Sequence, residues 1–218
     1  KDTIPFFVPP PLGKPPLAGR LCVVIPTFTY VIYGNHARGD FDPELWHKRA
    51  GTWPGAYKYN PAEHLEAYGA STYNRHLDGD GVAFASHRRP LLTLKSGFVS
   101  ITEKGGGSGV RHFQADSHLW AWLEAHKIDF DVITDHELHF DGPECLKGYQ
   151  AVATCTHPEY HTKQSLDTLV HYRDTGGRLL YLGGNGFYWR IAMQPPKGLK
   201  EANDRFGALE VRRAEGGI

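Results

Sequence analysis

Cysteine is scarce in this chain of 218 residues and occurs only as Cys22, Cys145 and Cys155. The number is odd and no Cys-x-x-Cys pair is present, which argues against a disulfide framework and against a zinc knuckle. A reducing cytoplasm is the simplest setting for this cysteine content, so we expect a cytoplasmic protein. No apolar run approaches the roughly twenty residues that a helix needs to cross a membrane.

The chain also has no formal net charge, because 24 lysines and arginines balance 24 aspartates and glutamates. This balance argues against a role in binding nucleic acid or a membrane surface. No Gly-x-Ser-x-Gly occurs, and the glycine run at 105–109 fits no phosphate-binding loop. The chain does have 13 histidines and 11 tyrosines. They suit a metal or a polar substrate, although surface histidines and core aromatics account for most of them.

The stretch 148–190 predicts a strand, a helix and a second strand. Gln150–Thr156 and Arg178–Leu182 are short apolar runs, and Thr162–Asp174 carries apolar residues at helical spacing. A strand, helix and strand within about thirty residues form a βαβ unit, so the two strands should be parallel and adjacent. Ligands bind at the carboxyl ends of such strands, where this chain has His157-Pro158-Glu159 and Gly183-Gly184-Asn185-Gly186.

Two further apolar runs, Leu21–Pro26 and Phe130–Thr134, predict buried strands of the same sheet. Asp116 is expected to cap a helix that runs to Lys127. The inner face of that helix should carry Leu119, Trp122, Leu123 and His126. Alternation of strands and helices predicts an α/β fold with a three-layer, doubly wound, mostly parallel sheet.

The remaining segments predict smaller elements and a division of the chain. Residues 1–18 form an extended, proline-rich arm, and residues 19–218 form the α/β domain. Gly39–Gly81 is a long loop-rich insertion of the kind that serves function or a partner. The smaller elements are short helices after Asp42-Pro43, after Asn60-Pro61 and near Pro143–Leu146, minor strands at Val82–Ser86 and Leu91–Leu94, a helix at Gly198–Phe206 and a strand beginning at Leu209–Arg213. Both ends are abrupt, so we expect a piece of a longer polypeptide, truncated at its C-terminal end.

Three polar residues at the predicted strand ends are candidates for chemistry. Glu159 is expected where a strand turns into a helix, and the helix N-terminus would stabilise its charge; a first-turn glutamate that only complements the dipole is the simpler alternative. His157 is a ligand, an acid or base, or a polar residue that closes the strand. Asn185, between two glycines, is either a left-handed turn residue or an amide that polarises a substrate carbonyl.

Tyr30, Tyr33 and Tyr73 are ordinary amphipathic aromatics by default. A tyrosine phenolate, however, is a hard anionic oxygen that suits Fe(III). Two phenolates and one carboxylate would give an all-oxygen site with three negative charges, matched to a trivalent iron. Cys155 is the alternative nucleophile, but it lies inside an apolar run without the glycines of a sharp elbow. A buried structural thiol is the interpretation that we favour for it.

At these residues the chain resembles the C-terminal domain of the large (β) subunit of N,N-dimethylformamidases. The similarity extends from about Leu21 to the end of the chain. The matching phrases are Pro26–Tyr30, Tyr33-Gly34-Asn35, Tyr73-Asn74-Arg75-His76, Trp120–Asp135, Thr156-His157-Pro158-Glu159-Tyr160 and Gly176–Arg190.

The resemblance implies a class I glutamine-amidotransferase-like fold and the hydrolysis of N,N-dimethylformamide to dimethylamine and formate. It also implies a mononuclear iron on Tyr33, Tyr73 and Glu159, with Tyr30 as the alternative to Tyr33, and with His157 and Asn185 nearby. The family enzyme has a small subunit, so a small subunit and an oligomer are the expected partners. The lectin-like amino-terminal part of the family's large subunit is absent from this sequence.

The expected mechanism is activation of a water molecule and the formyl oxygen by iron, with Glu159 or His157 moving a proton to the departing amine and Asn185 holding the oxyanion. Two other functions stay open. One is a cysteine-dependent amidotransferase or hydrolase that uses Cys155. The other is a non-catalytic binding or assembly domain of the same fold.

Overall fold

A four-stranded parallel sheet forms the centre of the computed structural model, which describes residues 4–14, 16, 20–36, 44, 48, 65–100, 109–194 and 207–212. The strand order is β3-β1-β4-β6, and every neighbouring pair is parallel. The strands are β1 (Leu21–Ile25), β3 (Phe130–Thr134), β4 (Ala151–Thr154) and β6 (Arg178–Leu180). All four were predicted from apolar runs, and β4 and β6 are adjacent, as the βαβ pattern requires.

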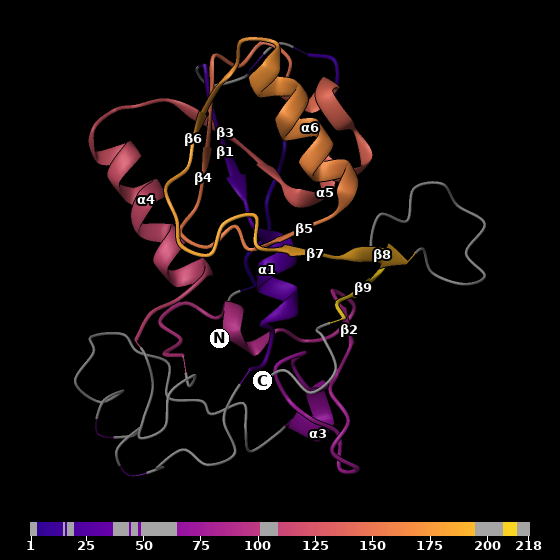
Figure 1. Ribbon diagram of the computed structural model, residues 1–218. Helices are drawn as coiled ribbons and strands as arrows, with labels where there is room; N and C mark the ends of the chain where they lie inside the picture. The colour runs from indigo at the N-terminus through magenta and orange to yellow at the C-terminus, as the bar shows by residue number, and fades with distance from the viewer. Residues whose placement is uncertain are drawn as a thin grey trace.

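Helices cover both faces of this sheet (Figure 1). One face carries α4 (Phe113–Ala125). The other face carries α5 (Asp135–Phe140), the short 3-10 helix η3 (Gly142–Leu146) and α6 (Lys163–Asp174). The predicted α/β class is therefore confirmed, and so are the short helix near Leu146 and the helix after Thr162.

The two faces are built by alternate residues of β1. Cys22 and Val24 pack into the cluster on the α6 side, whereas Val23 and Ile25 pack into the cluster on the α4 side. Side chains of a strand point alternately to opposite faces, so a strand that is covered on both faces must be apolar throughout. This is why the run at Leu21–Pro26 predicted a central strand correctly.

Helix α4 begins earlier than predicted and turns a different face to the sheet. Its N-cap is His112, so the expected cap, Asp116, lies inside the first turn. The carboxylate of Asp116 is buried and accepts hydrogen bonds from Thr156. That contact points residue 116 at the sheet, and Trp120 and Leu123 follow on the same face. The prediction was therefore wrong for two residues of the inner face. Trp122 is 52% exposed, and His126 is exposed as well.

Helix α1 (Thr27–Ile32) directly follows β1 and was not predicted. Its β-branched and aromatic residues are weak helix formers, and all of those from Phe28 to Ile32 are buried. A helix that is apolar all round shows no amphipathic period and is stabilised by burial instead. The chain turns just after the helix, where Asn35 has a positive φ of 62°.

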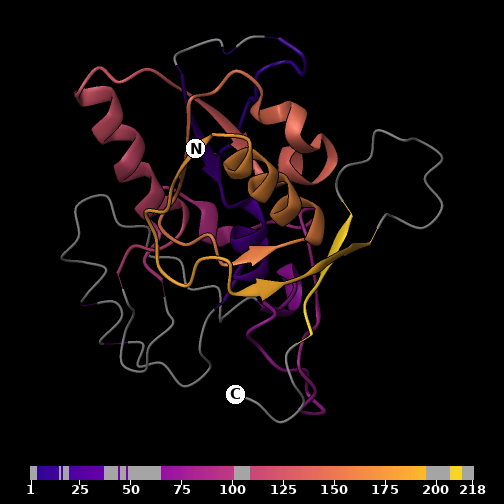
Figure 2. The ribbon, with the colours of Figure 1, turned by 45° about the horizontal axis from the view of Figure 1, so that its top comes forward.

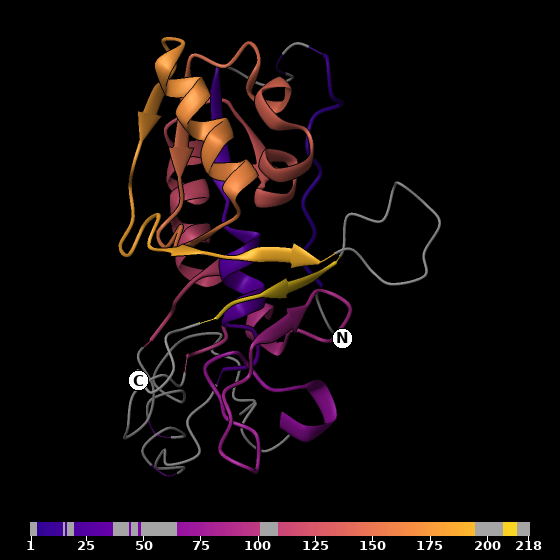
Figure 3. The same cartoon turned by 45° about the vertical axis from the view of Figure 1, so that its right-hand side comes forward.

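Two smaller sheets flank α1. The strands β5 (Tyr160–His161) and β7 (Trp189–Arg190) pair in parallel next to α1 (Figure 2). In Figure 3, β8 (Ala192–Gln194) continues the direction of β7, and β9 (Ala208–Glu210) runs antiparallel beside it. β2 (Phe84–Ser86) pairs with the other side of β9. The predicted strands near Ser86 and Leu209 are thus present.

The predicted strand at Leu91–Leu94 is wrong, since the 3-10 helix η2 (Leu92–Leu94) lies there. The backbone N–H of Leu92 donates to the side chain of Asn35, and that of Lys95 donates to the Leu92 carbonyl. These backbone groups bond locally or to a side chain, so no partner strand is needed.

Several expectations fall outside the described residues, namely the helix after Asp42-Pro43, most of the glycine run at 105–109 and the helix at Gly198–Phe206. Within the insertion, α3 (Leu65–Tyr68) follows Asn60-Pro61. Among the described residues, no helix has the length and apolar character to span a membrane.

Candidate functional site

Three tyrosine hydroxyls and one carboxylate form a chain of hydrogen-bonding contacts, and we call them the oxygen cluster. The hydroxyl of Tyr33 donates to Glu159 Oε2 at 2.8 Å, and that of Tyr73 donates to the Tyr33 oxygen at 2.7 Å. The hydroxyl of Tyr160 lies 2.5 Å from that of Tyr73. Glu159 is only 3% exposed and Tyr160 is fully buried. Oxygen atoms from distant parts of the chain therefore share one protected position.

Tyr33 enters the cluster from the end of α1. It is the C-cap of that helix, and its backbone N–H donates to the Thr29 carbonyl. Every α1 residue from Phe28 to Ile32 is buried, so the helix cannot rotate without exposing apolar surface. The packing of α1 therefore fixes the direction in which the Tyr33 phenol points.

Tyr73 is held against the same helix end by its neighbours. The hydroxyls of Ser71 and Thr72 donate to the Ile32 carbonyl at 3.0 and 3.1 Å. The last carbonyls of a helix have no partner within the helix, and these hydroxyls satisfy one of them. The rings of Tyr33 and Tyr73 stack, with centroids 4.2 Å apart.

Arg89 adds a second tie between these segments. Its Nη1 donates to the carbonyls of Gly69 and Ala70 at 2.6 and 2.8 Å, and its Nη2 donates to that of Gly34 at 3.1 Å. One planar guanidinium thus bridges the loop before Tyr73 and the turn after α1.

Glu159 lies before β5, and the prediction that it starts a helix is wrong. Helix α6 begins at Lys163, with Thr162 as its cap. The carbonyl of Glu159 accepts hydrogen bonds from the backbone N–H groups of Tyr188 and Trp189 at 3.1 and 3.0 Å. The hydrogen-bonded pair of strands β5 and β7 therefore separates Glu159 from helix α6. The carboxylate of Glu159 is stabilised by neighbouring side chains and not by the helix dipole.

His157 completes the contacts of this carboxylate. Its Nε2 lies 3.0 Å from Glu159 Oε2, and its side chain is 15% exposed. Oε2 of Glu159 therefore contacts both His157 and Tyr33, and the imidazole forms the side of the cluster that reaches solvent.

Asn185 is not joined to the oxygen cluster. It is exposed, with a φ of 48°, and no hydrogen bond links its side chain to the cluster among the described residues. Its loop packs close to the end of β4, since Gly184 N–H donates to the Thr156 carbonyl. A Cβ added to Gly183 would come within 2.6 Å of the carbonyl oxygens of residues 155 and 156. The left-handed turn accounts for Asn185 in this conformation.

Burial keeps the proton on Tyr33. Burial raises the pKa of its phenol strongly, and the neighbouring Tyr73 and the charge of Glu159 raise the pKa further. A phenolate at this position therefore needs a cation beside it, because a positive charge is what lowers the pKa of a buried acid.

Nitrogen-containing side chains surround the open side of the cluster. The ring of His112 lies 4.3 Å from that of Tyr33 and 5.5 Å from that of His157, between centroids. His112 Nε2 is buried and has no hydrogen-bond partner among the described residues. Burial, followed by the charges of Arg111, His157 and His36, lowers the pKa of His112 well below its usual value. Low basicity therefore keeps the imidazole beside Tyr33 neutral.

Tyr30 lies in a different network. Its hydroxyl donates to Asp116 Oδ2, and the other oxygen of Asp116 accepts from the N–H and hydroxyl of Thr156. Its ring packs at 90° against Phe113 in the α4-side cluster. Of the two tyrosines considered as first ligand, Tyr33 is therefore the one that the fold brings to Tyr73 and Glu159.

Cys155 is fully buried, in the α4-side cluster. Burial raises the pKa of its thiol well above the ordinary value, and the charge of Asp116 raises it further. Since the thiolate is the nucleophile, this environment makes Cys155 inert.

The donor set of the cluster suits a hard, highly charged cation. Phenolate and carboxylate oxygens favour such ions over soft ones. Oxygen separations of 2.7 and 2.8 Å match adjacent positions of an octahedral site with bonds of about 2.0 Å. Ordinary hydrogen bonds have the same length, so it is the types of donor that distinguish this site. No group of three or more His, Cys, Asp or Glu residues that could hold a metal occurs in the described part of the chain.

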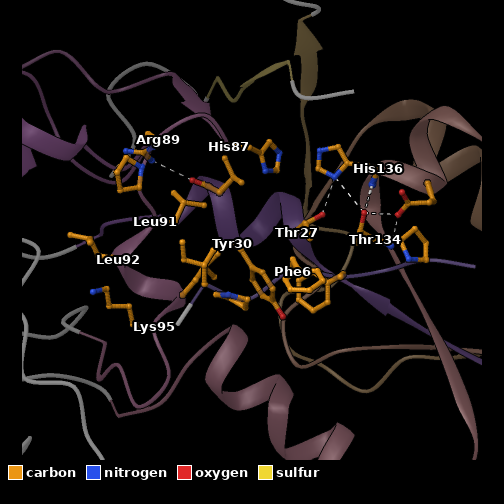
Figure 4. Close-up of a pocket in the computed structure, with 18 residues that line it drawn as sticks. Phe6, Thr27, Tyr30, His87, Arg89, Leu91, Leu92, Lys95, Thr134 and His136 are labelled. Atoms are coloured by element: carbon orange, nitrogen blue, oxygen red, sulfur yellow. Dashed lines mark hydrogen bonds between the residues drawn. The ribbon is translucent and has the colours of Figure 1, made fainter. Parts of the chain in front are cut away.

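A cavity of about 590 Å³ lies elsewhere. Figure 4 shows the rings of His87 and His136 near each other on one side of it, with Phe6 and Tyr30 on the other. Its lining is mainly apolar and includes the proline-rich arm. It lacks the phenol–carboxylate contacts of the oxygen cluster, so we place the candidate site at the cluster.

Sequence reasoning gave no role to Tyr160, His112, His36 or Arg111. Tyr160 follows Glu159 directly, and its position beside a candidate ligand was the one signal available. The others approach Tyr33 through space, with Arg111 Cζ 5.8 Å from its ring centre. Nothing in their sequence context indicates that contact.

Comparison with known proteins shows which family the chain resembles. A family model described as "N,N-dimethylformamidase beta subunit-like, C-terminal" matches residues 1–216. The N,N-dimethylformamidase beta subunit of Paracoccus aminophilus is 38% identical over 209 residues, which cover 90% of this chain and 25% of the relative. That of Alcaligenes sp is 36% identical over 209 residues, with the same coverage. The chain thus spans about a quarter of the length of these relatives. Because the family model matches nearly the whole chain, the chain belongs to the N,N-dimethylformamidase beta subunit-like, C-terminal family.

Proposed function

We propose that this chain is the catalytic domain of an iron-dependent hydrolase of small N-substituted amides, with N,N-dimethylformamide as substrate and dimethylamine and formate as products. The observation that carries the proposal is the meeting of Tyr33, Tyr73 and Glu159 in one buried cluster. Membership of the dimethylformamidase family supports it. We further propose that the sheet is of the class I glutamine-amidotransferase-like type and that a small subunit completes the oligomer, since the relatives are named beta subunits.

The residues suited to hold iron are Tyr33, Tyr73 and Glu159, which together supply two phenolates and a carboxylate. Three negative charges balance Fe(III), as the donor chemistry favours. When bound, the ion supplies Lewis acidity, which lowers the pKa of a water molecule and polarises an amide carbonyl.

The chain's own groups then handle protons and orientation. His157, at 3.0 Å from Glu159 Oε2, holds the carboxylate in place and carries a proton to the departing amine nitrogen. Tyr33 keeps one face of the site closed to water because its ring packs between those of Tyr73 and His112. Asn185 stabilises the oxyanion only if its loop turns the amide inward, since the side chain is exposed in this conformation.

The test is the metal content and the visible absorption spectrum of the purified protein with the subunits that co-purify. We expect iron in a one-to-one ratio to the chain and a phenolate-to-iron charge-transfer band. Glu159→Gln preserves the size of the side chain but removes its charge, so the variant should lose iron and turnover of N,N-dimethylformamide together.

Glu124→Gln is the matched control, because Glu124 is exposed on α4. It should retain iron, band and turnover. A folded wild-type protein that hydrolyses the amide without iron, or a Glu159→Gln variant with full iron and turnover, would overturn the proposal.

A further inference from the structure

Tyr160 is the largest fully buried side chain of the described residues, and its hydroxyl is the last member of the oxygen cluster. Its backbone pairs with Trp189 in the β5–β7 ladder, which fixes its position along the chain. Its ring packs in the same apolar cluster as α1. A phenol held this firmly, 2.5 Å from the Tyr73 oxygen, has a defined hydrogen-bonding role.

The direction of that hydrogen bond follows from counting protons, because each phenol has only one. The carboxylate of Glu159 is an acceptor, so the proton of Tyr33 points to Glu159. At the next contact Tyr33 is then the acceptor, and the proton of Tyr73 points to Tyr33. Tyr73 has no second proton to give. At the last contact Tyr160 must therefore be the donor.

Metal binding changes the first two of these protons but not the third. Tyr33 and Tyr73 lose their protons if their oxygens bind a cation, as the proposed function requires. Tyr160 keeps its proton and still points it at the Tyr73 oxygen. A hydrogen bond to an anionic ligand withdraws electron density from it, which is how residues around a metal site tune the metal.

We propose, on the basis of the proposed function, that Tyr160 is a positioning residue that donates a hydrogen bond to the Tyr73 phenolate and lowers the electron density that this ligand gives to iron. The two neighbouring residues Glu159 and Tyr160 thus have different roles, one binding iron and the other controlling a ligand 87 residues earlier in the chain.

The test is Tyr160→Phe in the protein as isolated, with the subunits that co-purify. The variant keeps the aromatic ring and removes only the donor. We expect iron to remain in the preparation. The charge-transfer band should move to longer wavelength, because the electrons of a phenolate that lacks this hydrogen bond lie higher in energy. Iron affinity should fall about 10–100-fold, because the loss of this partner leaves the Tyr73 oxygen less firmly oriented, and this outweighs the stronger donation.

Tyr172→Phe is the matched control. Tyr172 is also a buried tyrosine, but its hydroxyl donates to the Tyr149 carbonyl in the α6-side cluster. This variant should lose some stability and keep the position of the band.

The outcomes separate this inference from the proposed function. If wild-type protein shows no iron and no band, the proposed function fails. If wild type shows both and Tyr160→Phe leaves the band where it was, only the role of Tyr160 fails. A third outcome is that Tyr160→Phe loses the band while Tyr73→Phe keeps one iron per chain. Tyr160 would then be the iron ligand in place of Tyr73, and the inference would also be overturned.

Discussion

At the scale of single residues, two buried acids, Glu159 and Asp135, differ in their partners. The carboxylate of Glu159 meets Tyr33 and His157. The carboxylate of Asp135 accepts a hydrogen bond from the backbone N–H of Phe28 at 2.9 Å through Oδ2, while its Oδ1 is buried without a hydrogen-bond partner among the described residues. Burying a charge with incomplete hydrogen bonding favours the neutral form.

Asp135 should therefore give the stability of the protein a specific dependence on pH. Burial raises its pKa well above 3.8, the Phe28 N–H opposes this, and Glu137 adds to it. The native state then binds a proton that the unfolded state has lost, so stability falls as pH rises from about 4 through the folded pKa, by at most about 1.4 kcal/mol per pH unit. Asp135→Asn should flatten this fall, as urea unfolding across that range would measure.

Asp129→Asn is the control for that experiment, because Asp129 is exposed just before β3. Its curve of stability against pH should run parallel to that of wild type. Parallel curves for wild type and Asp135→Asn would contradict the assignment of the effect to Asp135.

The residues of the site were only partly predictable from their own neighbourhood. His157 and Glu159 stood out because polar residues followed a predicted parallel strand, and the structure brings both to the oxygen cluster. Tyr33 and Tyr73 were candidates because of a family resemblance, since 40 residues separate them and no local pattern joins them. Asn185 was expected at the site, but its loop turns the side chain to solvent. A positive φ between glycines fixes a turn and does not fix what the side chain contacts.

At the scale of elements, the segment that carries Tyr73 is attached to α1 mainly by backbone carbonyls and the few side chains that reach them. Arg89 contacts the carbonyls of Gly69, Ala70 and Gly34. Lysine has one point charge in place of the planar fork and cannot satisfy all three at once. We expect Arg89→Lys to lower the free energy of unfolding by about 1–3 kcal/mol, measured by urea denaturation.

The same variant should loosen the contact between Tyr33 and Tyr73, and so weaken the proposed binding of iron beyond what a general loss of stability explains. Arg88→Lys serves as the control, since Arg88 is the exposed neighbour and should change neither property. Equal stability of the two variants would show that Arg89 does not tie these segments together.

Elements were predictable where one local pattern determined them. The strands of the parallel sheet are continuous apolar runs, and burial on both faces makes such runs reliable. Helix α1 was missed because its residues suit strands and its stability comes from burial on every side. Helix α4 was found, but its inner face was wrong, because Asp116 bonds across to Thr156 and turns the helix accordingly. Contacts between distant segments decided both cases.

At the scale of the whole molecule, a bound cation would add stability that its removal takes away. A ligand that binds only the native state stabilises it by about 4 kcal/mol when its concentration is 1,000 times the dissociation constant. Treatment with an iron chelator should therefore lower the melting temperature of the wild-type protein. The Glu159→Gln variant should melt at the same temperature with and without the chelator. An equal effect of the chelator on both would locate the stabilising ion elsewhere.

The wide spacing of the oxygen cluster along the sequence has a consequence for how the protein matures. Tyr33 and Glu159 lie 126 residues apart, and the backbone of Glu159 is held in turn by Trp189. During synthesis the first tyrosine leaves the ribosome long before the carboxylate, and the strand that supports the carboxylate follows later still. Closing contacts over such distances comes late in folding. A nascent chain without β7 thus lacks the support of the Glu159 backbone, so the proposed loading with metal would mark molecules that have finished folding.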